Sequence, residues 1–96
     1  MIIAQLSITP IGEGTSVSKY VNIALNAIKE MGIHFEVGAM ATTLEAKSLD
    51  ELFRVVKKAH DAVIDAGAKR VVIDLKIDDR KNESATIKSK LKAIER

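Results

Sequence analysis

The 96-residue sequence has no cysteine, no tryptophan, one tyrosine and two phenylalanines. The absence of cysteine excludes disulfides, thiolate metal sites and cysteine nucleophiles. The scarcity of aromatic side chains leaves few platforms on which unpaired bases could stack. No apolar run approaches the roughly 20 residues needed to cross a bilayer. We therefore expect residues 1–96 to form one folded domain, and we expect it to be cytoplasmic because the N-terminus lacks the pattern of a secretion signal.

Charge is nearly balanced along the chain, with a formal net charge of +2. Residues 80–96 are the exception, since six basic residues against two acidic ones give this segment a charge of +4. A basic helix can bind nucleic acid, but a solvated helix face explains the pattern more simply.

The most informative stretch runs from Ile2 to Tyr20 and reads as a strand, a glycine-containing loop and the start of a helix. Apolar residues alternate with Gln5, Ser7 and Thr9 along the strand from Ile2 to Thr9. A merely solvated face usually carries Lys and Glu. The short polar face therefore indicates either contact with a ligand or second sheet, or an ordinary exposed surface.

The loop between strand and helix contains Gly12 and Gly14, where positive φ is permitted. Two glycines before a helix can cradle an anion. The segment lacks the third glycine of a dinucleotide fingerprint and the lysine of a P-loop, so the phosphate signal is weak. The helix that follows is predicted from about Ser16 to Met31. Its predicted apolar stripe is Val17, Val21, Ala24, Leu25, Ile28 and Met31.

The middle of the chain predicts two extended segments and a second helix. A strand is expected over residues 34–40, with Gly38 indicating a bulge or a close backbone approach, and a second extended piece over 41–47 makes a hairpin or a kinked pair. Ser48 and Glu51 form a capping-box motif, so a helix begins there. It is predicted to end at Gly67 and to carry an i,i+4 pair between Asp50 and Arg54. Its predicted apolar stripe is Leu49, Leu52, Phe53, Val56, Ala59, Val63 and Ala66.

The last third predicts a strand over residues 70–78 and a short helix whose narrow apolar stripe is Ile87, Leu91 and Ile94. The resulting order, β-α-β-β-α-β plus a helix, predicts an α+β ferredoxin-like sandwich with a four-stranded antiparallel sheet. Right-handed crossovers place both long helices on one sheet face. The other face is predicted to be uncovered and to carry Gln5, Ser7, Glu36, Asp74 and Lys76.

No constellation typical of catalysis or metal binding is present in the sequence. The two histidines, His34 and His60, lack the spacing of a metal site, and Ser7 has no nucleophile elbow around it. The aspartates at 74, 78 and 79 alternate with basic residues, so ion pairing is favoured over cation binding. We therefore predict a protein that is not an enzyme and has no metal or cofactor.

Three segments, Ser7–Val21, Met40–Glu51 and Arg70–Asn82, resemble the small thiamine-binding protein family, the YkoF-like group. The middle segment keeps Thr42 and Glu45 and has Ala41 and Ala46 where the family motif has glycine. The resemblance implies a ferredoxin-like fold and a homotetramer built from sheet-paired dimers. It also implies binding of thiamine or its pyrimidine moiety, hydroxymethylpyrimidine, without catalysis.

The ligand-binding residues implied by this resemblance are Ser7, Thr42, Glu45, Gly12 and Ser16. A carboxylate with small polar partners suits a cationic thiazolium and an aminopyrimidine. Ordinary strand propensity for Thr42 and a solvated charge at Glu45 are the alternative interpretations. Two other functions remain open: a regulatory or structural homo-oligomer with no small-molecule ligand, and weak nucleic-acid binding through the basic C-terminal segment.

Overall fold

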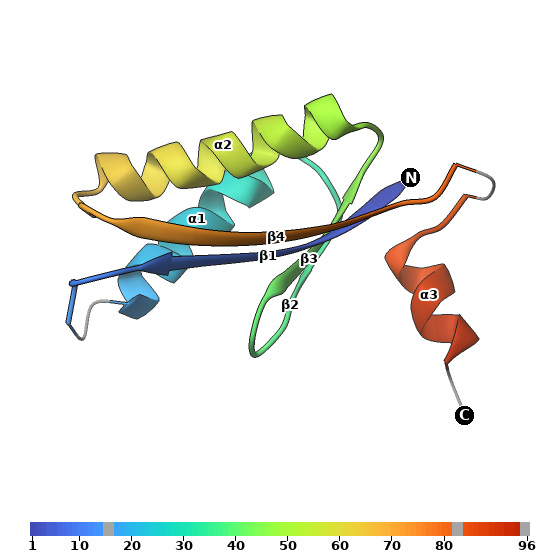
Figure 1. The fold of residues 1–96 in the computed structure, drawn as a ribbon, viewed down its shortest axis with the longest axis horizontal. Coiled ribbons are helices and arrows are strands. Elements are labelled where there is room, and N and C mark those ends of the chain that lie inside the picture. Colours follow the sequence, from blue (N-terminus) through green and yellow to red (C-terminus); the bar gives the residue numbers. More distant parts are fainter. Residues whose placement is uncertain (15–16, 82–83, 95–96) are drawn as a thin grey trace.

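The computed structural model describes residues 1–14, 17–81 and 84–94. Its elements lie in the predicted order (Figure 1). Their bounds are β1 Ile2–Pro10, α1 Val17–Glu30, β2 Phe35–Val37, β3 Thr42–Ala46, α2 Leu49–Asp65, β4 Val71–Asp79 and α3 Ile87–Ala93. The four strands form one antiparallel sheet in the order β2-β3-β1-β4, so the ferredoxin-like α+β prediction is confirmed.

The hydrophobic core lies between one face of the sheet and the helices α1 and α2. Alternate residues of β1 enter it, which explains why Ile2, Ala4 and Leu6 are each at most 3% exposed. The fully buried side chains with the largest volumes are Ile28, Leu44, Leu52, Val55 and Val63. We call the opposite side of the sheet the open face, and its existence confirms the predicted layering. Within the described ranges, no helix has the length and hydropathy to cross a membrane.

The β2–β3 hairpin differs from the strand predicted over residues 34–40. Strand β2 has only three residues, and the chain then turns. The Gly38 N–H donates to the Ala41 carbonyl at 2.9 Å, and a Cβ at Gly38 would lie 2.9 Å from that same oxygen. Gly38 therefore marks the predicted close backbone approach, not a bulge. Residues 38–40, which the prediction assigned to the strand, lie in the turn instead.

Helix α2 begins at its predicted cap, with one change in the hydrogen bonding. The Ser48 hydroxyl accepts from the Glu51 N–H at 3.1 Å, as predicted. The Glu51 carboxylate accepts from the Lys47 N–H at 2.9 Å, one residue before the predicted donor. The predicted ion pair between Asp50 and Arg54 is absent from the described contacts. Both side chains therefore cap the helix, but the Glu51 carboxylate does not bind the Ser48 N–H as a capping box requires.

The predicted apolar stripes of the long helices include residues that face solvent. On α2, Leu49 is 40% and Phe53 49% exposed, whereas Val55, which the predicted stripe omits, is fully buried. On α1, Val17 and Val21 are likewise exposed. The buried sets are Leu52, Val55, Ala59 and Val63 on α2, and Tyr20, Ala24, Ala27 and Ile28 on α1. The apolar spacing of a helix fixes its buried face only to within about one residue. How each helix is rotated against the sheet therefore decides which residues of the stripe are buried.

Helix α3 lies on the open-face side of the sheet, away from α1 and α2 (Figure 1). Its cap is Thr86, whose hydroxyl accepts from the Ser89 N–H at 3.0 Å. Ile87 is buried in a small cluster with Ile3 and Ala85. The rest of the predicted stripe, Leu91 and Ile94, is 53% and 72% exposed. The helix therefore packs against the sheet through its first turn only.

Candidate ligand-binding site on the open sheet face

Polar side chains meet across the strands in the middle of the open face. Ser7 on β1 lies directly opposite Asp74 on β4, and Gln5 lies opposite Lys76. On the other side of β1, Gln5 is opposite Thr43 of β3. Residues opposite each other on one sheet face have Cβ atoms about 5 Å apart, so these groups can act together.

These residues line a hollow of about 360 Å³, which we call the central hollow. Its lining residues are Gln5, Ser7, Met40, Ala41, Asp74, Leu75 and Lys76. Met40, from the β2–β3 turn, is 88% exposed and supplies an apolar rim. The volume lies within the range of about 300 to 1,000 Å³ typical of small-molecule sites.

The charged side chains of the central hollow have no partner in the described part of the chain. The alternation in the sequence predicts that Arg70, Lys76 and Arg80 neutralise the aspartates of β4. The partners found for Asp78 and Asp79 are other residues. The structure pairs Asp78 with Lys90 at 2.6 Å and Asp79 with Lys81 at 3.0 Å. Asp74 makes no hydrogen bond or ion pair with any described residue, so the ion-pairing prediction is wrong for Asp74. Its carboxylate is available to a ligand.

A second hollow of about 260 Å³ continues the open face toward α3. Gln5 and Lys76 line both hollows, and Thr43 lies in the second one. The far end is closed by the pair between Lys90 and Asp78. The hydrogen bond from Lys90 lowers the pKa of Asp78, so this pair stays charged near neutrality. The two hollows therefore follow each other along the open face from Met40 to α3, with Gln5 and Lys76 between them and Asp74 in the hollow nearer Met40.

Glu45 also lies on the open face, but it is engaged by α3. It sits opposite Ile3, is only 8% exposed, and accepts a hydrogen bond from the Ile87 N–H at the start of α3. Ser7 is four residues farther along β1 than Ile3, roughly 13 Å at about 3.3 Å per residue. The structure therefore does not bring Glu45 and Ser7 into one contact set. A ligand role for Glu45 stays a prediction.

Thr42 lies on the opposite face of the sheet from Ser7. It pairs with Leu6, is 8% exposed, and lines a crevice of about 40 Å³ under α1. Gly12 is in the loop after β1 with φ +83°, the positive value that its glycine allowed. Ser16 lies outside the described residues. Of the predicted ligand set, only Ser7 lines the central hollow.

Sequence reasoning missed the combination of Asp74, Gln5 and Met40. Strand alternation placed Gln5 and Asp74 on the open face, as the structure confirms. It could not place Asp74 opposite Ser7, because that neighbour depends on the register between β1 and β4. Met40 carried no signal, since the predicted strand covered the turn that displays it.

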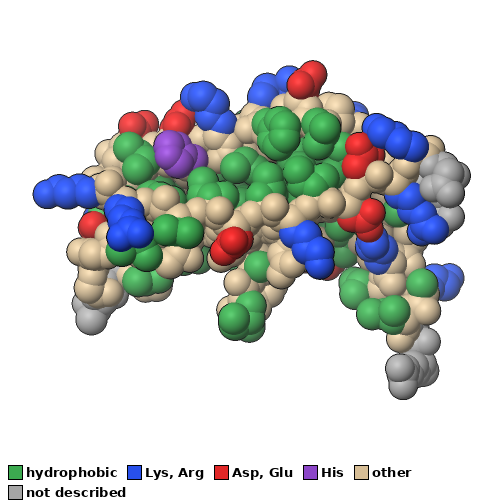
Figure 2. Space-filling view, viewed as in Figure 1, with side chains coloured by type: hydrophobic (Ala, Val, Ile, Leu, Met, Phe, Trp, Pro, Cys, Tyr) green, Lys and Arg blue, Asp and Glu red, His purple; other side chains and the backbone are tan. Residues whose placement is uncertain are grey.

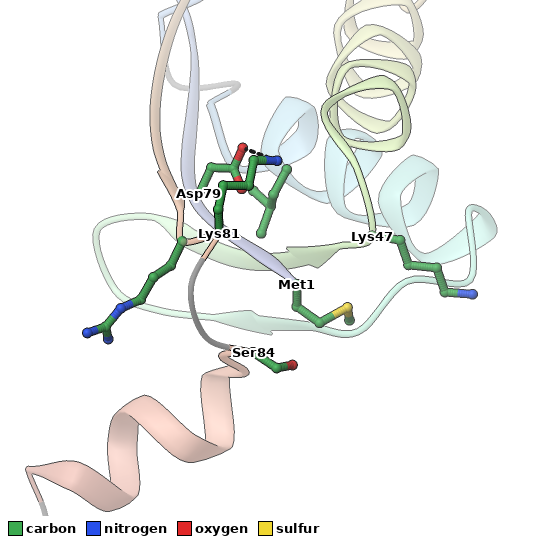
Figure 3. A pocket seen from close by; sticks show the side chains of 7 residues that line it. Met1, Lys47, Asp79, Lys81 and Ser84 are labelled. Carbon is green, nitrogen blue, oxygen red and sulfur yellow. Dashed lines mark ion pairs between the residues drawn. The ribbon is translucent and has the colours of Figure 1, made fainter.

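A larger hollow of about 480 Å³ lies at the other end of the sheet, where Met1, Lys47, Asp79, Lys81 and Ser84 contribute to its wall (Figure 3). Asp79 and Lys81 already pair with each other there. The Lys47 side chain extends away from this pair (Figure 3). The labelled polar groups of this hollow therefore do not converge on one point.

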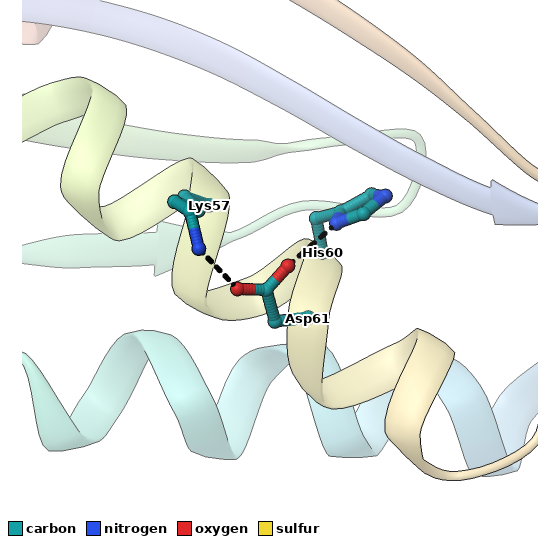
Figure 4. A network of polar contacts seen from close by, with 3 residues as sticks. All are labelled: Lys57, His60 and Asp61. Carbon is teal, nitrogen blue, oxygen red and sulfur yellow. Dashed lines mark hydrogen bonds and ion pairs between the residues drawn. The ribbon is translucent and has the colours of Figure 1, made fainter.

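Both histidine side chains are partly exposed, His34 at 56% and His60 at 43%. On α2, Asp61 lies between Lys57 and His60, with Oδ2 2.6 Å from Lys57 Nζ and Oδ1 2.9 Å from His60 Nδ1 (Figure 4). Hydrogen bonds from Lys57 and His60 lower the pKa of Asp61. Among residues 1–14, 17–81 and 84–94, no group of three potential ligands could hold a metal ion. The contacts among Lys57, His60 and Asp61 therefore lie on the exposed surface of α2.

The hydrogen bond from Ile87 predicts how Glu45 contributes to stability. Glu45→Ala should lower the free energy of unfolding by about 1 to 3 kcal/mol, because a buried N–H loses its acceptor. Glu45→Gln keeps an oxygen acceptor and should cost less. Urea denaturation measures both, and amide exchange of α3 locates the effect. Equal stability of Glu45→Ala and the wild type would contradict this role.

The fold and the site together define a small ferredoxin-like α+β protein with an open, polar sheet face. The chain belongs to the thiamine-binding protein family, whose model matches residues 4–95. A UPF0045 protein of Methanothermobacter thermautotrophicus is 43% identical over 95 residues, covering 98% of this chain and 96% of the relative. A protein of Methanocaldococcus jannaschii with a solved crystal structure is 46% identical in sequence and superposes with a TM-score of 0.88. The match covers 97% of this chain and 94% of that one.

The fold is also shared by a more distant solved structure. It is a Thermotoga maritima protein assigned provisionally to thiamine biosynthesis or salvage, which is 26% identical with a TM-score of 0.83. The alignment covers 98% of both chains. The resemblance stated from the sequence is thereby confirmed at the level of the family.

Proposed function

We propose that this protein binds thiamine or a related pyrimidine, such as hydroxymethylpyrimidine, in the central hollow and does not transform it. The observation that carries the proposal is the Asp74 carboxylate, which lies opposite Ser7 and has no partner among the described residues, in a chain of the thiamine-binding family. Gln5 lines the same hollow. The name given to the Thermotoga relative supports the same ligand class.

The chemistry of the hollow suits thiamine in three respects. The thiazolium ring is a cation, and Asp74 offers it a carboxylate. The aminopyrimidine has both donors and acceptors, which the Gln5 amide can match in either sense, and the Ser7 hydroxyl can do the same for one group. Met40 offers a polarizable thioether to the edge of an aromatic ring. Lys76 lies on the same wall and suits a phosphorylated form of the ligand.

The alanines that replace the family's glycines are compatible with this site. None of the described residues other than glycine has a positive φ, so neither Ala41 nor Ala46 is strained. Ala46 is fully buried and pairs with Ile2 on the helix-covered face, away from the hollow. Ala41 lines the hollow, so its methyl group narrows the site slightly. Ala41→Gly should therefore retain or improve binding.

We further propose a cytoplasmic homotetramer. The exposed Leu91 and Ile94 of α3, together with the open face, are surfaces that a domain of this size gains stability by covering. A homotetramer built from sheet-paired dimers covers both. Light scattering that shows a stable monomer at micromolar concentration would contradict it.

Calorimetry tests the ligand directly. The wild type should bind thiamine with one site per chain, and thiamine monophosphate and hydroxymethylpyrimidine should raise its melting temperature if they share the site. Ala41→Gly is titrated beside it as the variant with a wider hollow. No response of either protein to the three ligands would favour the assembly-only function. Retention on RNA that falls steeply with salt would favour the basic C-terminal segment instead.

A further inference from the structure

The polar side chains of the open face form rows that run across the strands. One row joins Ser7 of β1 to Asp74 of β4. The next row, toward α3, joins Thr43 of β3, Gln5 of β1 and Lys76 of β4. Two residues along a strand span roughly 6.6 Å, so the two rows lie about that far apart. Gln5 and Lys76 line both the central hollow and the second hollow, so the second row is the boundary between them.

The charges on the open face alternate along β4. This face of the strand carries Asp74, Lys76 and Asp78 in turn. In the space-filling view, side chains of both charges lie along the lower border of the hydrophobic area, where β4 runs (Figure 2). Asp78 is paired with Lys90 at 2.6 Å, whereas neither Asp74 nor Lys76 has an ion partner among the described residues. The open face therefore presents one unpaired negative charge and, one row closer to α3, one unpaired positive charge.

The second hollow collects hydrogen-bond donors. The Lys76 ammonium, the Gln5 amide and the Thr43 hydroxyl all belong to residues that line it. No described residue accepts a hydrogen bond from these three side chains. The carboxylate in the lining, Asp78, is neutralised by Lys90, which lines the same hollow. Two lysines and one aspartate leave the lining with a net positive charge, and donors around a positive charge suit an oxyanion.

The central hollow has the opposite character at its far end. Asp74 lines the central hollow and is absent from the lining of the second hollow. A ligand that spans both hollows is therefore met by a carboxylate at one end and by an ammonium with neutral donors at the other. The complementary molecule has a cationic ring and, a few bonds away, an anionic group with several oxygens.

We propose that the two hollows together bind a phosphate ester of thiamine, with the thiazolium ring beside Asp74 and the phosphate group in the second hollow beside Lys76. This inference rests on the proposed thiamine site and adds the form of the ligand. In thiamine monophosphate, the short hydroxyethyl arm of the thiazolium ring carries the phosphate, so the two charges of the ligand are as close as those of Asp74 and Lys76. Lys76 attracts the ester and repels the cation of free thiamine. It is therefore the residue that sets the preference between them.

Calorimetry of the wild type at low ionic strength tests the preference. Thiamine monophosphate should bind roughly tenfold more tightly than thiamine, because the phosphate gains charge-assisted hydrogen bonds. This advantage should shrink as salt is added, since the open face is exposed to solvent. Monophosphate binding that is equal to or weaker than thiamine binding would overturn the inference and leave the thiamine site standing. Binding of neither compound would refute the proposed function, and this inference with it.

Substitution of Lys76 tests the residue. Lys76→Gln keeps a polar side chain and removes the charge, so the preference for the monophosphate over thiamine should fall by roughly tenfold. Lys76→Glu should reverse the preference. Lys29→Gln is the matched control, because Lys29 is an exposed residue of α1 on the other side of the sheet, and its variant should keep the wild-type preference. A wild-type preference in Lys76→Gln, folded by circular dichroism, would overturn the role of Lys76.

Substitution of Lys90 tests where the phosphate lies. Lys90→Gln leaves the Asp78 carboxylate without its partner in the second hollow, so the monophosphate should be weakened more than thiamine. The additional change Asp78→Asn should restore the preference. Lys92→Gln is the control on the same helix, because Lys92 is exposed and lines neither hollow. An equal effect of Lys90→Gln on both ligands, or no effect, would overturn the placement of the phosphate in the second hollow.

Discussion

Asp74→Asn should weaken thiamine binding by about 2 kcal/mol, roughly thirtyfold in the dissociation constant. The substitution keeps the shape of the side chain and removes the charge that faces a cationic ring. We choose Asp74 for this test because it makes no hydrogen bond or ion pair with any described residue. It also lies opposite Ser7 in the central hollow. Isothermal titration calorimetry measures the change.

Asp65→Asn is the matched control, since it removes the same charge from an exposed position on α2, on the other side of the sheet. It should bind thiamine as the wild type does. Ser7→Ala should fall between the two, because it removes a neutral hydrogen bond worth about 1 kcal/mol. Unchanged affinity in Asp74→Asn, with thiamine bound by the wild type, would refute the central hollow as the site. Glu45→Gln in the same series tests the ligand role predicted for that residue.

Leu52→Ala should lower the free energy of unfolding by about 3 to 4 kcal/mol. Leu52 is fully buried in the core between α2 and the sheet, and its removal leaves a cavity that the packed neighbours cannot fill. Urea denaturation followed by circular dichroism measures the difference.

Leu91→Ala is the corresponding control in α3, where the leucine is 53% exposed. In the single chain it should cost less than about 1 kcal/mol, because little apolar surface is lost from a packed environment and alanine favours the helix. A loss in Leu91→Ala as large as that in Leu52→Ala would show that Leu91 is buried between subunits, as the proposed homotetramer requires.

The local patterns of the sequence determined most of the fold. Alternation along β1 and β4 is a property of each strand alone, so the apolar and polar faces could be read directly. The Ser48 cap and the glycine at 67 bounded α2 for the same reason, since both act within one turn. The order of the elements then restricted the topology to the ferredoxin-like arrangement. The uncovered polar face followed from that topology.

Tertiary structure decided which of these residues meet. Periodicity predicted Leu49 and Leu52 on one stripe, but only the docking of α2 exposed the first and buried the second. Alternation could not relate Thr42 to Ser7, because the β1–β3 register sets Thr43, not Thr42, beside Gln5 on the open face. Glu45 took the Ile87 N–H through a contact between residues 42 positions apart. Register and docking depend on contacts between distant segments, which no local pattern of side chains contains.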